Sequence, residues 1–346
     1  MREIVIVIAD LYLPPEVRGL GHANGGVAAV PPALAHALRF GSHAALPHGW
    51  REWLAHWLGR PDLAAASVAS IAGAATGVRE GPLWLATPMH WIAGPSGVHL
   101  DARAILHLSP LELQALAADF NAAFRHSAVT VRPLASGELL ALGPEAFGAR
   151  TVEPARMPLA GLADSQPAGG GAAALRRLGS EIEMWLRDQA LNRARTARGE
   201  RTVSALWFWG GSTPELPAGP QRPDSPAPAP PCVALGTDAY LAGLARLTGS
   251  TAAALPQELG TGPRAADSGR VVLVLDLGRL PQSEPWSLAA ALAEADRRYL
   301  APALQALRRG ACRSLTLLAN DHSVRLRAHH RWRLWRRGRP GLEGLS

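Results

Sequence analysis

A short hydrophobic run near the N-terminus constrains the fold of this chain more than any other feature. Residues 4–9 read Ile-Val-Ile-Val-Ile-Ala, a mostly β-branched sequence with no polar position, and Asp10 follows directly. A strand with one face in water alternates apolar and polar residues, whereas a strand buried on both faces does not. The run therefore predicts a central strand of a parallel sheet, with Asp10 at its C-terminal end.

Similar runs recur near the other end of the chain. Residues 271–277 and 314–318 are the next predicted buried strands, and helical patterns over 27–40 and 287–309 lie between the three. Alternation of strands and helices is typical of the α/β class. Between them, a block with shorter strands and an antiparallel hairpin (129–133 with 138–142) has a mixed character. We therefore predict an α/β fold with a largely parallel sheet and an inserted α+β lobe.

The predicted boundaries follow from these patterns. The core comprises 1–80 and 232–325, the lobe 85–205, and the tail 326–346 is rich in Arg and Trp. Residues 214–231 contain eight prolines and no apolar periodicity, as expected for a linker.

The lobe carries three local signals. Ser109 and Glu112 form a predicted capping box around Pro110, which is favoured in a first helical turn. Residues 172–198 predict the longest helix. Residues 203–214, Val-Ser-Ala-Leu-Trp-Phe-Trp-Gly-Gly-Ser-Thr-Pro, predict a buried strand that ends in a tight glycine turn.

Composition excludes some classes of protein. Hydrophobic residues make up 48% and charged residues 18% of 346 residues, which indicates a globular chain. The N-terminal run is too short for a signal peptide and no stretch reaches the roughly 18 apolar residues of a membrane span. Cys232 and Cys312 have no metal or redox spacing, so we expect free thiols. These features predict a cytoplasmic protein with no membrane contact.

The net charge of +7 allows contact with anionic partners but is weak evidence for nucleic-acid binding. The tail from 325 to 339 carries seven arginines with Trp332 and Trp335. A solvated amphipathic element explains this pattern better than a nucleic-acid site does. The partner is left open, with another protein as one possibility.

Three residues form the strongest chemical constellation. Asp10 and the pair Asp321-His322 follow two predicted parallel strands. If those strands are neighbours, the three side chains meet at one sheet edge, where carboxylate and imidazole ligands suit a divalent metal. The alternative, which spacing alone favours, is that Asp10 caps a loop and Asp321-His322 form an ordinary turn. The sequence has no phosphate-binding P-loop, dinucleotide fingerprint or Gly-x-Ser-x-Gly elbow.

Several segments together resemble a known family. The segment containing Asn192, Arg193 and Arg195, followed by Ser-Ala-Leu-Trp-Phe-Trp-Gly-Gly (204–211), resembles the archaeal-type cofactor-independent phosphoglycerate mutases. It is still more similar to their bacterial relatives, the RpfE-type regulatory proteins. Met89-His90-Trp91, Asp119-Phe120-Asn121 and residues 300–304 are similar to the same group.

The resemblance implies an alkaline-phosphatase-like core with a phosphate-transferring site. That superfamily holds two divalent metals with aspartates and histidines and uses a serine or threonine nucleophile. Asp10 resembles the first aspartate, and Asp321-His322 resemble the late Asp-His pair. Asn192, Arg193 and Arg195 are the substrate-binding residues that the resemblance implies. The implied cofactor is Mn, Mg or Zn if the site functions, and none otherwise.

This chain departs from that pattern in two places. Trp50-Arg51 stand near the position of the nucleophilic serine, and residues 278–284 lack the Asp and His expected after the strand 271–277. The resemblance therefore predicts a degenerate, non-catalytic regulatory or binding protein. The alternative is a metal-dependent phosphotransferase, interconverting 2- and 3-phosphoglycerate, with a rearranged site.

Overall fold

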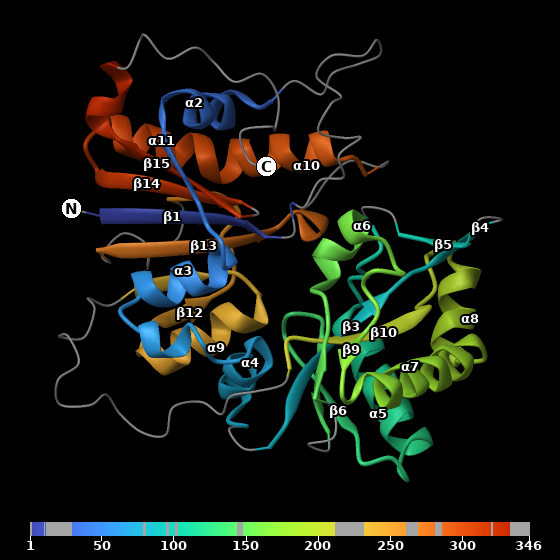
Figure 1. Ribbon diagram of the computed structural model, residues 1–346. Helices are drawn as coiled ribbons and strands as arrows, with labels where there is room; N and C mark the ends of the chain where they lie inside the picture. Colours follow the sequence, from blue (N-terminus) through green and yellow to red (C-terminus); the bar gives the residue numbers. More distant parts are fainter. Residues whose placement is uncertain are drawn as a thin grey trace. The chain divides into compact units, whose positions relative to one another are not determined.

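In the computed structural model (Figure 1), the chain forms two compact units. Unit 1 comprises Met1–Ala64 and Pro220–Ser346, and unit 2 is Ala65–Gly219. The structure describes residues 2–9, 11, 30–78, 81–94, 97–100, 103–143, 148–211, 232–260, 269–280, 286–319 and 321–332. Asp10, the predicted linker 214–231 and the tail beyond 332 lie outside the described residues.

Unit 1 is built on a seven-stranded sheet in the order β12-β11-β13-β1-β14-β15-β2. Every pair from β12 to β14 is parallel, and β15 is antiparallel to both β14 and β2. The α/β class with a largely parallel sheet is confirmed, and β1 is its central strand. The bounds are Thr251–Ala253 (β12), Cys232–Leu235 (β11), Arg270–Asp276 (β13), Arg2–Ala9 (β1), Cys312–Ala319 (β14), His322–Arg327 (β15) and Ser42–Ala45 (β2).

Helices cover both faces of this sheet. Figure 1 shows α2 (Pro32–Phe40), α10 (Leu288–Ala295) and α11 (Ala301–Arg308) on one face and α3 (Gly49–Trp57) and α9 (Ala239–Thr248) on the other. Because both faces are covered, β1 has no solvent-facing side, which explains its unbroken hydrophobic run.

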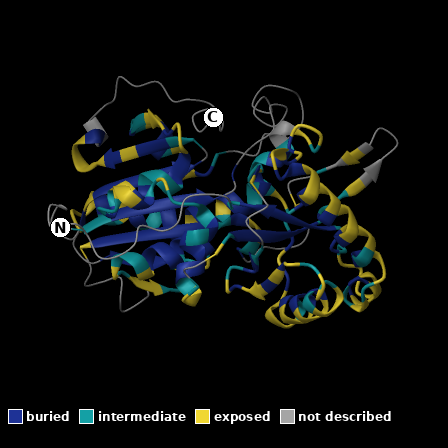
Figure 2. Cartoon of the chain, turned by 60° about the horizontal axis from the view of Figure 1, so that its bottom comes forward, coloured by how far each residue is buried: buried dark blue, intermediate teal, exposed yellow. Residues whose placement is uncertain are grey.

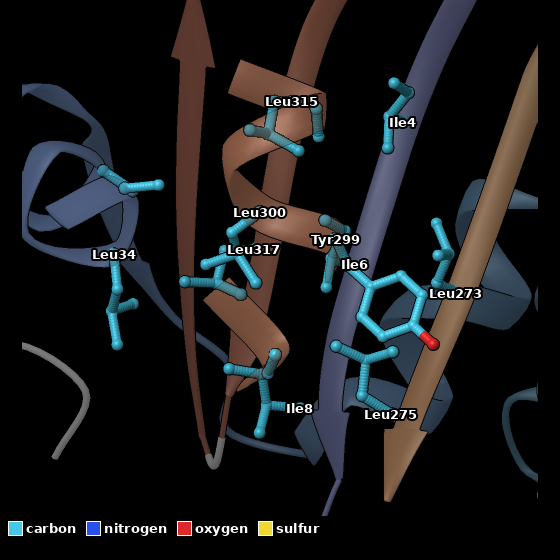
Figure 3. Close-up of a cluster of buried hydrophobic side chains, with 14 of the residues drawn as sticks. Ile4, Ile6, Ile8, Leu34, Leu273, Leu275, Tyr299, Leu300, Leu315 and Leu317 are labelled. Atoms are coloured by element: carbon cyan, nitrogen blue, oxygen red, sulfur yellow. The ribbon is translucent and has the colours of Figure 1, made fainter. Parts of the chain in front are cut away.

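The core on the α2 face is made by alternate residues of neighbouring strands. Ile4, Ile6 and Ile8 of β1 point into a cluster that includes Tyr299 and Leu300 (Figure 3). Each side chain is at most 3% exposed. Burial of such a side chain contributes about 1.5–3 kcal/mol, so this layer fixes the register of the sheet.

The predicted helix 287–309 contains a π-helical stretch, Asp296–Leu300, between α10 and α11. Asp296 is buried, and its carboxylate accepts the backbone N–H groups of Ala33 (3.2 Å) and Leu34 (2.7 Å). Burial raises the pKa of Asp296. Because Pro31 at the N-cap of α2 offers no side-chain acceptor, Asp296 caps that helix from far along the chain.

Unit 2 contains a four-stranded antiparallel sheet in the order β10-β3-β7-β6. The predicted hairpin is confirmed as β6 and β7, and the predicted capping box is present at α5. The strands are Ala205–Trp209 (β10), Leu83–Met89 (β3), Leu139–Leu142 (β7) and Thr130–Pro133 (β6). The helices are Val68–Thr76 (α4), Pro110–Ala123 (α5), Met157–Ala160 (α6), Ala172–Arg187 (α7) and Ala190–Ala197 (α8).

Several short elements complete the described chain. Two small antiparallel ribbons join β4 (Ile92–Gly94) with β5 (Gly97–His99) and β8 (Ala149–Arg150) with β9 (Ala168–Gly169). Single 3-10 turns lie at Pro61–Leu63, Pro154–Arg156, Leu277–Arg279 and Ala328–Trp332. No helix among the described residues is long and apolar enough to cross a membrane.

The bounds of the two units differ from the domain boundaries expected from the sequence. Helix α4 lies in unit 2, whereas the sequence placed residues up to 80 in the core. This helix packs on β3 and β7, and the Ala69 N–H donates to the Gly210 carbonyl at 2.9 Å. These contacts attach α4 to the sheet of unit 2.

The prediction of one helix over 172–198 is wrong. Helix α7 ends at Arg187, and α8 begins at Ala190 after Gln189 in an extended conformation. Neither Gly nor Pro stands at the break, so the sequence gives no stop signal there.

The strand β10 ends at the predicted glycine turn. Gly210 has φ +67°, and a Cβ on Gly211 would lie 2.2 Å from the Trp84 ring. Both positions therefore require glycine. Figure 2 shows the strands of both sheets as largely buried, and every residue of β10 is buried. The tryptophans of this strand are packing residues, as their pattern indicates.

Candidate functional site

The candidate site lies at the C-terminal edge of the sheet in unit 1. Strand β1 pairs in parallel with β13 and β14, so Ala9 lies opposite Asp276, and Ile8 lies opposite Ala319. The strands that precede Asp10 and Asp321 are thus neighbours, as the metal hypothesis requires. Ligand sites of α/β proteins lie at this edge.

Asp321 and His322 form the turn from β14 into β15. His322 pairs with Ala319 on one side and with Ala45 of β2 on the other. The Asp321 carbonyl accepts the Leu46 N–H at 2.6 Å. The pair is therefore joined to the segment that leads into α3.

His322 carries an unused hydrogen-bonding atom. Its Nδ1 is buried and has no hydrogen-bond partner among the described residues. Most buried polar atoms in folded proteins are paired, because an unpaired one costs about 1–3 kcal/mol. This nitrogen is free to bind a ligand or a metal.

Asp276 is the residue that sequence reasoning missed. It is the last residue of β13, whereas the sequence-based expectation concerned residues 278–284, after the predicted strand. The signal was available, since Val-Val-Leu-Val-Leu-Asp repeats the pattern of residues 4–10. Its carboxylate accepts the Gly278 N–H at 2.9 Å and forms an ion pair with Arg279 at 3.1 Å. The charge of Asp276 is therefore balanced within its own turn.

The first turn of α3 contains no hydroxyl or thiol side chain. Trp50 is 2% exposed and packs edge-on against Tyr240, with ring centroids 5.9 Å apart. The Arg51 guanidinium lies 4.5 Å from the centroid of the Trp50 ring, and the Tyr240 hydroxyl donates to the Arg51 carbonyl. Indole and guanidinium groups do not accept a phosphoryl group at neutral pH. Helix α3 presents an arginine where the resemblance implies a serine.

A divalent metal needs several side-chain ligands that converge on it. The described residues contain no group of three or more His, Cys, Asp or Glu side chains that could hold one. His322 Nδ1 suits a metal, whereas the Asp276 carboxylate would first have to leave Arg279. At the C-terminal edge of the sheet, the described residues alone do not form a metal site, and such a site would need Asp10 as a further ligand.

The predicted substrate residues lie in unit 2. Asn192 is buried, and its Nδ2 group donates to the carbonyls of Leu186 (2.7 Å) and Val203 (2.8 Å). Its Oδ1 accepts the Val203 N–H at 2.7 Å. Both donors of this amide are therefore used within the fold. Arg193 is exposed and donates to the Asp188 carbonyl.

Arg195 is the centre of an ion-pair network. Its Nε donates to the Arg201 carbonyl at 2.6 Å, and its guanidinium lies 2.9 Å from Glu112 and 3.2 Å from Glu200. Burial acts to raise the pKa of Glu112, but hydrogen bonds from Ser109 and Arg195 outweigh it and lower that pKa. The network joins α8 to the capping box of α5.

Comparisons with known proteins give distant structural similarity only. No protein-family model matches the chain, and no curated protein matches its sequence. Among solved structures, a cofactor-independent phosphoglycerate mutase from Thermoplasma acidophilum DSM 1728 is 14% identical with a TM-score of 0.39, over 94% of this chain and 90% of that one. The PH0037 protein from Pyrococcus horikoshii is 12% identical with a TM-score of 0.46, over 94% and 86%. These TM-scores are too low to carry an argument about activity.

Proposed function

We propose that this chain is a phosphoglycerate-mutase-like protein with an alkaline-phosphatase-like core that binds a ligand without transferring phosphate. As part of this proposal we place the chain with the regulatory RpfE-type proteins, which residues 191–211 resemble. The proposal also includes a cytoplasmic location and a protein partner.

The ion pair of Asp276 with Arg279 carries this proposal. In a working site of the implied kind, carboxylates at the strand ends neutralise a divalent metal. Here the carboxylate at the end of β13 is already neutralised by a guanidinium 3.1 Å away. The first turn of α3 also supplies Trp50 and Arg51 in place of a hydroxyl group. Both differences favour binding over phosphoryl transfer.

One observation favours the second candidate, a metal-dependent phosphoglycerate mutase or phosphatase with a rearranged site. His322 Nδ1 is buried without a partner among the described residues, as expected for a nitrogen that waits for a metal. If a metal binds, Asp10, Asp321 and His322 are the residues that would hold it. It would neutralise charge on a transferring phosphoryl group.

A turnover assay separates the two candidates. We expect the purified chain to convert no 3-phosphoglycerate to 2-phosphoglycerate, with or without Mn²⁺, and to contain no stoichiometric metal. Turnover that depends on Mn²⁺ and disappears in Asp321→Ala and His322→Ala, but not in the distant Arg246→Gln, would establish the enzyme instead. Metal analysis of the same preparations shows whether His322 binds a metal without catalysis.

A further inference from the structure

A second feature of unit 1 is a polar block on β14 and β15, on the face of the sheet opposite α2 (Figure 1). In both strands, residues of the core cluster on the α2 face alternate with residues that point to the opposite face. On that opposite face, Ser314 of β14 pairs directly with Arg327 of β15. Thr316 and Arg325 form the next such pair, two residues along. Because cross-strand neighbours have Cβ atoms about 4.5–5.5 Å apart, two hydroxyl groups and two guanidinium groups are gathered on one surface.

Protection of a sheet edge does not explain these two arginines. The Arg325 side chain is 46% exposed, and Arg327 is exposed as well. Charged side chains on an edge strand prevent the sheet from pairing with another chain. Strand β15, however, lies between β14 and β2 and is not an edge. Two exposed arginines on an inner strand therefore point to a different role.

Carboxylates balance only part of the charge of this block. Glu3 of β1 forms an ion pair with Arg325 at 3.9 Å, and an exposed pair of this length contributes little. Strands β14, β15 and β2 contain no Asp or Glu. Arg327 forms no ion pair with a carboxylate of the described residues. Two guanidinium groups therefore face a single carboxylate, and the charge of Arg327 is not neutralised by any described side chain.

The hydroxyl groups of the block are unused within the described fold. Ser314 is 2% exposed and Thr316 is 5% exposed, yet neither hydroxyl forms a hydrogen bond with another described residue. By contrast, Ser323 on the same face of β15 donates to the Ala44 carbonyl at 3.3 Å. Neither unpaired oxygen is completely buried, so each still touches solvent. Because buried hydroxyl groups are normally paired, two unused ones side by side indicate a place for a ligand oxygen.

We propose that this block of two hydroxyl and two guanidinium groups binds an oxyanion, with a phosphate group as its ligand. Guanidinium groups bind phosphate oxygens through paired, charge-assisted hydrogen bonds, and hydroxyl groups add neutral donors. A phosphate group carries about 1.5 to 2 negative charges at neutral pH, so it neutralises the block. Arg327 brings the charge that has no carboxylate partner, and Arg325 exchanges its long contact with Glu3 for the ligand.

This site lies apart from the candidate functional site. Asp321 follows the C-terminal end of β14, whereas Ser314 is the third residue of that strand. Ala319, the last residue of β14, lies five residues beyond Ser314, or roughly 16 Å at about 3.3 Å per residue. The block is therefore near the opposite edge of the sheet, and the proposal does not depend on the function proposed above.

NMR titration of the full chain with inorganic phosphate, at constant ionic strength, tests the site. We expect saturable shifts of the backbone amide signals of residues 314–316 and 325–327. Arg327→Gln should weaken phosphate binding at least about fivefold, because it removes the charge that has no carboxylate partner. Arg246→Gln, which removes an exposed arginine from the last turn of α9, is the matched control and should change binding less than about twofold.

Thr316→Val separates a role in binding from a role in the fold. Valine keeps the shape of the side chain but lacks the hydroxyl group, so phosphate binding should weaken about two- to threefold. The melting temperature should stay unchanged or rise, because no hydrogen bond among the described residues is lost. A lower melting temperature with unchanged phosphate binding would assign this hydroxyl group to the fold and contradict the proposed site.

Amide shifts that do not saturate, or equal losses in Arg327→Gln and Arg246→Gln, would overturn the proposal. Arg325→Gln provides the same test should Arg327→Gln fold poorly. A single-stranded oligonucleotide tested beside inorganic phosphate distinguishes the source of the phosphate group. Binding of the free ion that depends on Arg327 indicates a small phosphate ligand, whereas binding of the oligonucleotide alone, with the same dependence, indicates a nucleic-acid backbone.

Discussion

Asn192 in unit 2 and His322 in unit 1 are both predicted binding residues, yet they use their polar atoms in opposite ways. Both Asn192 donors and its acceptor are bound to backbone groups. His322 Nδ1 is buried with no partner among the described residues. A side chain with each polar atom bound to the backbone is suited to hold the fold, whereas one with an unused atom is suited to hold a ligand. Residue type alone does not separate these roles.

A second asparagine repeats the arrangement at the other edge of the same sheet. Asn121 of α5 donates to the Val131 carbonyl at 2.9 Å and accepts the Val131 N–H at 2.8 Å. Asn192 does the same for Val203, just before β10. Each amide bonds both the N–H and the carbonyl of one valine, as a neighbouring strand would. It therefore occupies backbone groups with which another chain could otherwise pair. Unit 2 therefore uses one half-buried amide, Asn121, and one buried amide, Asn192, to cover a backbone position at each edge of its sheet.

The largest expected effect comes from removing Asn192. Asn192→Ala removes the partner of both the Val203 N–H and the Val203 carbonyl in a buried place, whereas the Leu186 carbonyl still accepts the Gln189 N–H, so we expect unit 2 to lose about 3–4 kcal/mol of stability. Urea unfolding followed by tryptophan fluorescence measures the loss, and hydrogen exchange of the Val203 amide locates it.

Arg193→Ala is the control for this comparison. Arg193 is adjacent and exposed, so its replacement should change stability by less than about 0.5 kcal/mol. If Asn192→Ala were as mild as Arg193→Ala, Asn192 would not be structural, and its predicted role in substrate binding would gain support.

Arg195→Met is expected to have the next largest effect. It leaves Glu112 with one guanidinium partner, Arg198, and we expect a loss of about 2–3 kcal/mol at neutral pH. The folded pKa of Glu112 is lowered, so its contribution is present above the unfolded pKa of about 4.3 and is lost as the pH falls through the folded pKa. Unfolding free energies measured from pH 7 to pH 3 should therefore fall less steeply in Arg195→Met. Equal slopes in both proteins would contradict this assignment.

Sequence patterns predicted the parts of the fold that depend on local periodicity. The three buried strands, the hairpin and the Ser109–Glu112 capping box are present because each follows from residue type and spacing alone. The break between α7 and α8 was not predictable, because it depends on Asn192 reaching the Leu186 carbonyl, a contact that has no sequence signature.

The candidate site was predictable only in outline. The hydrophobic runs indicated that Asp10 and Asp321 each follow a parallel strand and left open whether those strands are neighbours, and the pairing of β1 with β14 shows that they are. The ion pair of Asp276 with Arg279 depends on the conformation of one turn, and the unpaired Nδ1 of His322 depends on what surrounds it. Such features arise from packing, so no residue pattern reports them.

The turn after β10, like Asn192, is expected to hold the fold, here through close packing of its backbone. In Gly211→Ala the new methyl group would overlap the Trp84 ring and the Leu83 carbonyl, at 2.2 and 2.7 Å. Because the ring is 1% exposed, it has no room to move, and we expect a loss of about 1–3 kcal/mol. Thermal unfolding measures this loss. Gly81→Ala, at a positive φ with no atom near its Cβ position, separates backbone strain from overlap and should cost less.

The smallest effect should come from His322, and it tests the other half of the comparison. His322→Leu removes a buried nitrogen that has no partner among the described residues, so it breaks no known hydrogen bond. Replacing an unsatisfied polar group with an apolar one is close to neutral or stabilising, and we expect a change within about 1 kcal/mol. Thermal unfolding measures stability, and isothermal titration with Mn²⁺ reports any loss of metal binding. A loss as large as that of Asn192→Ala would show that His322 supports the fold and that the contrast between the two residues is false.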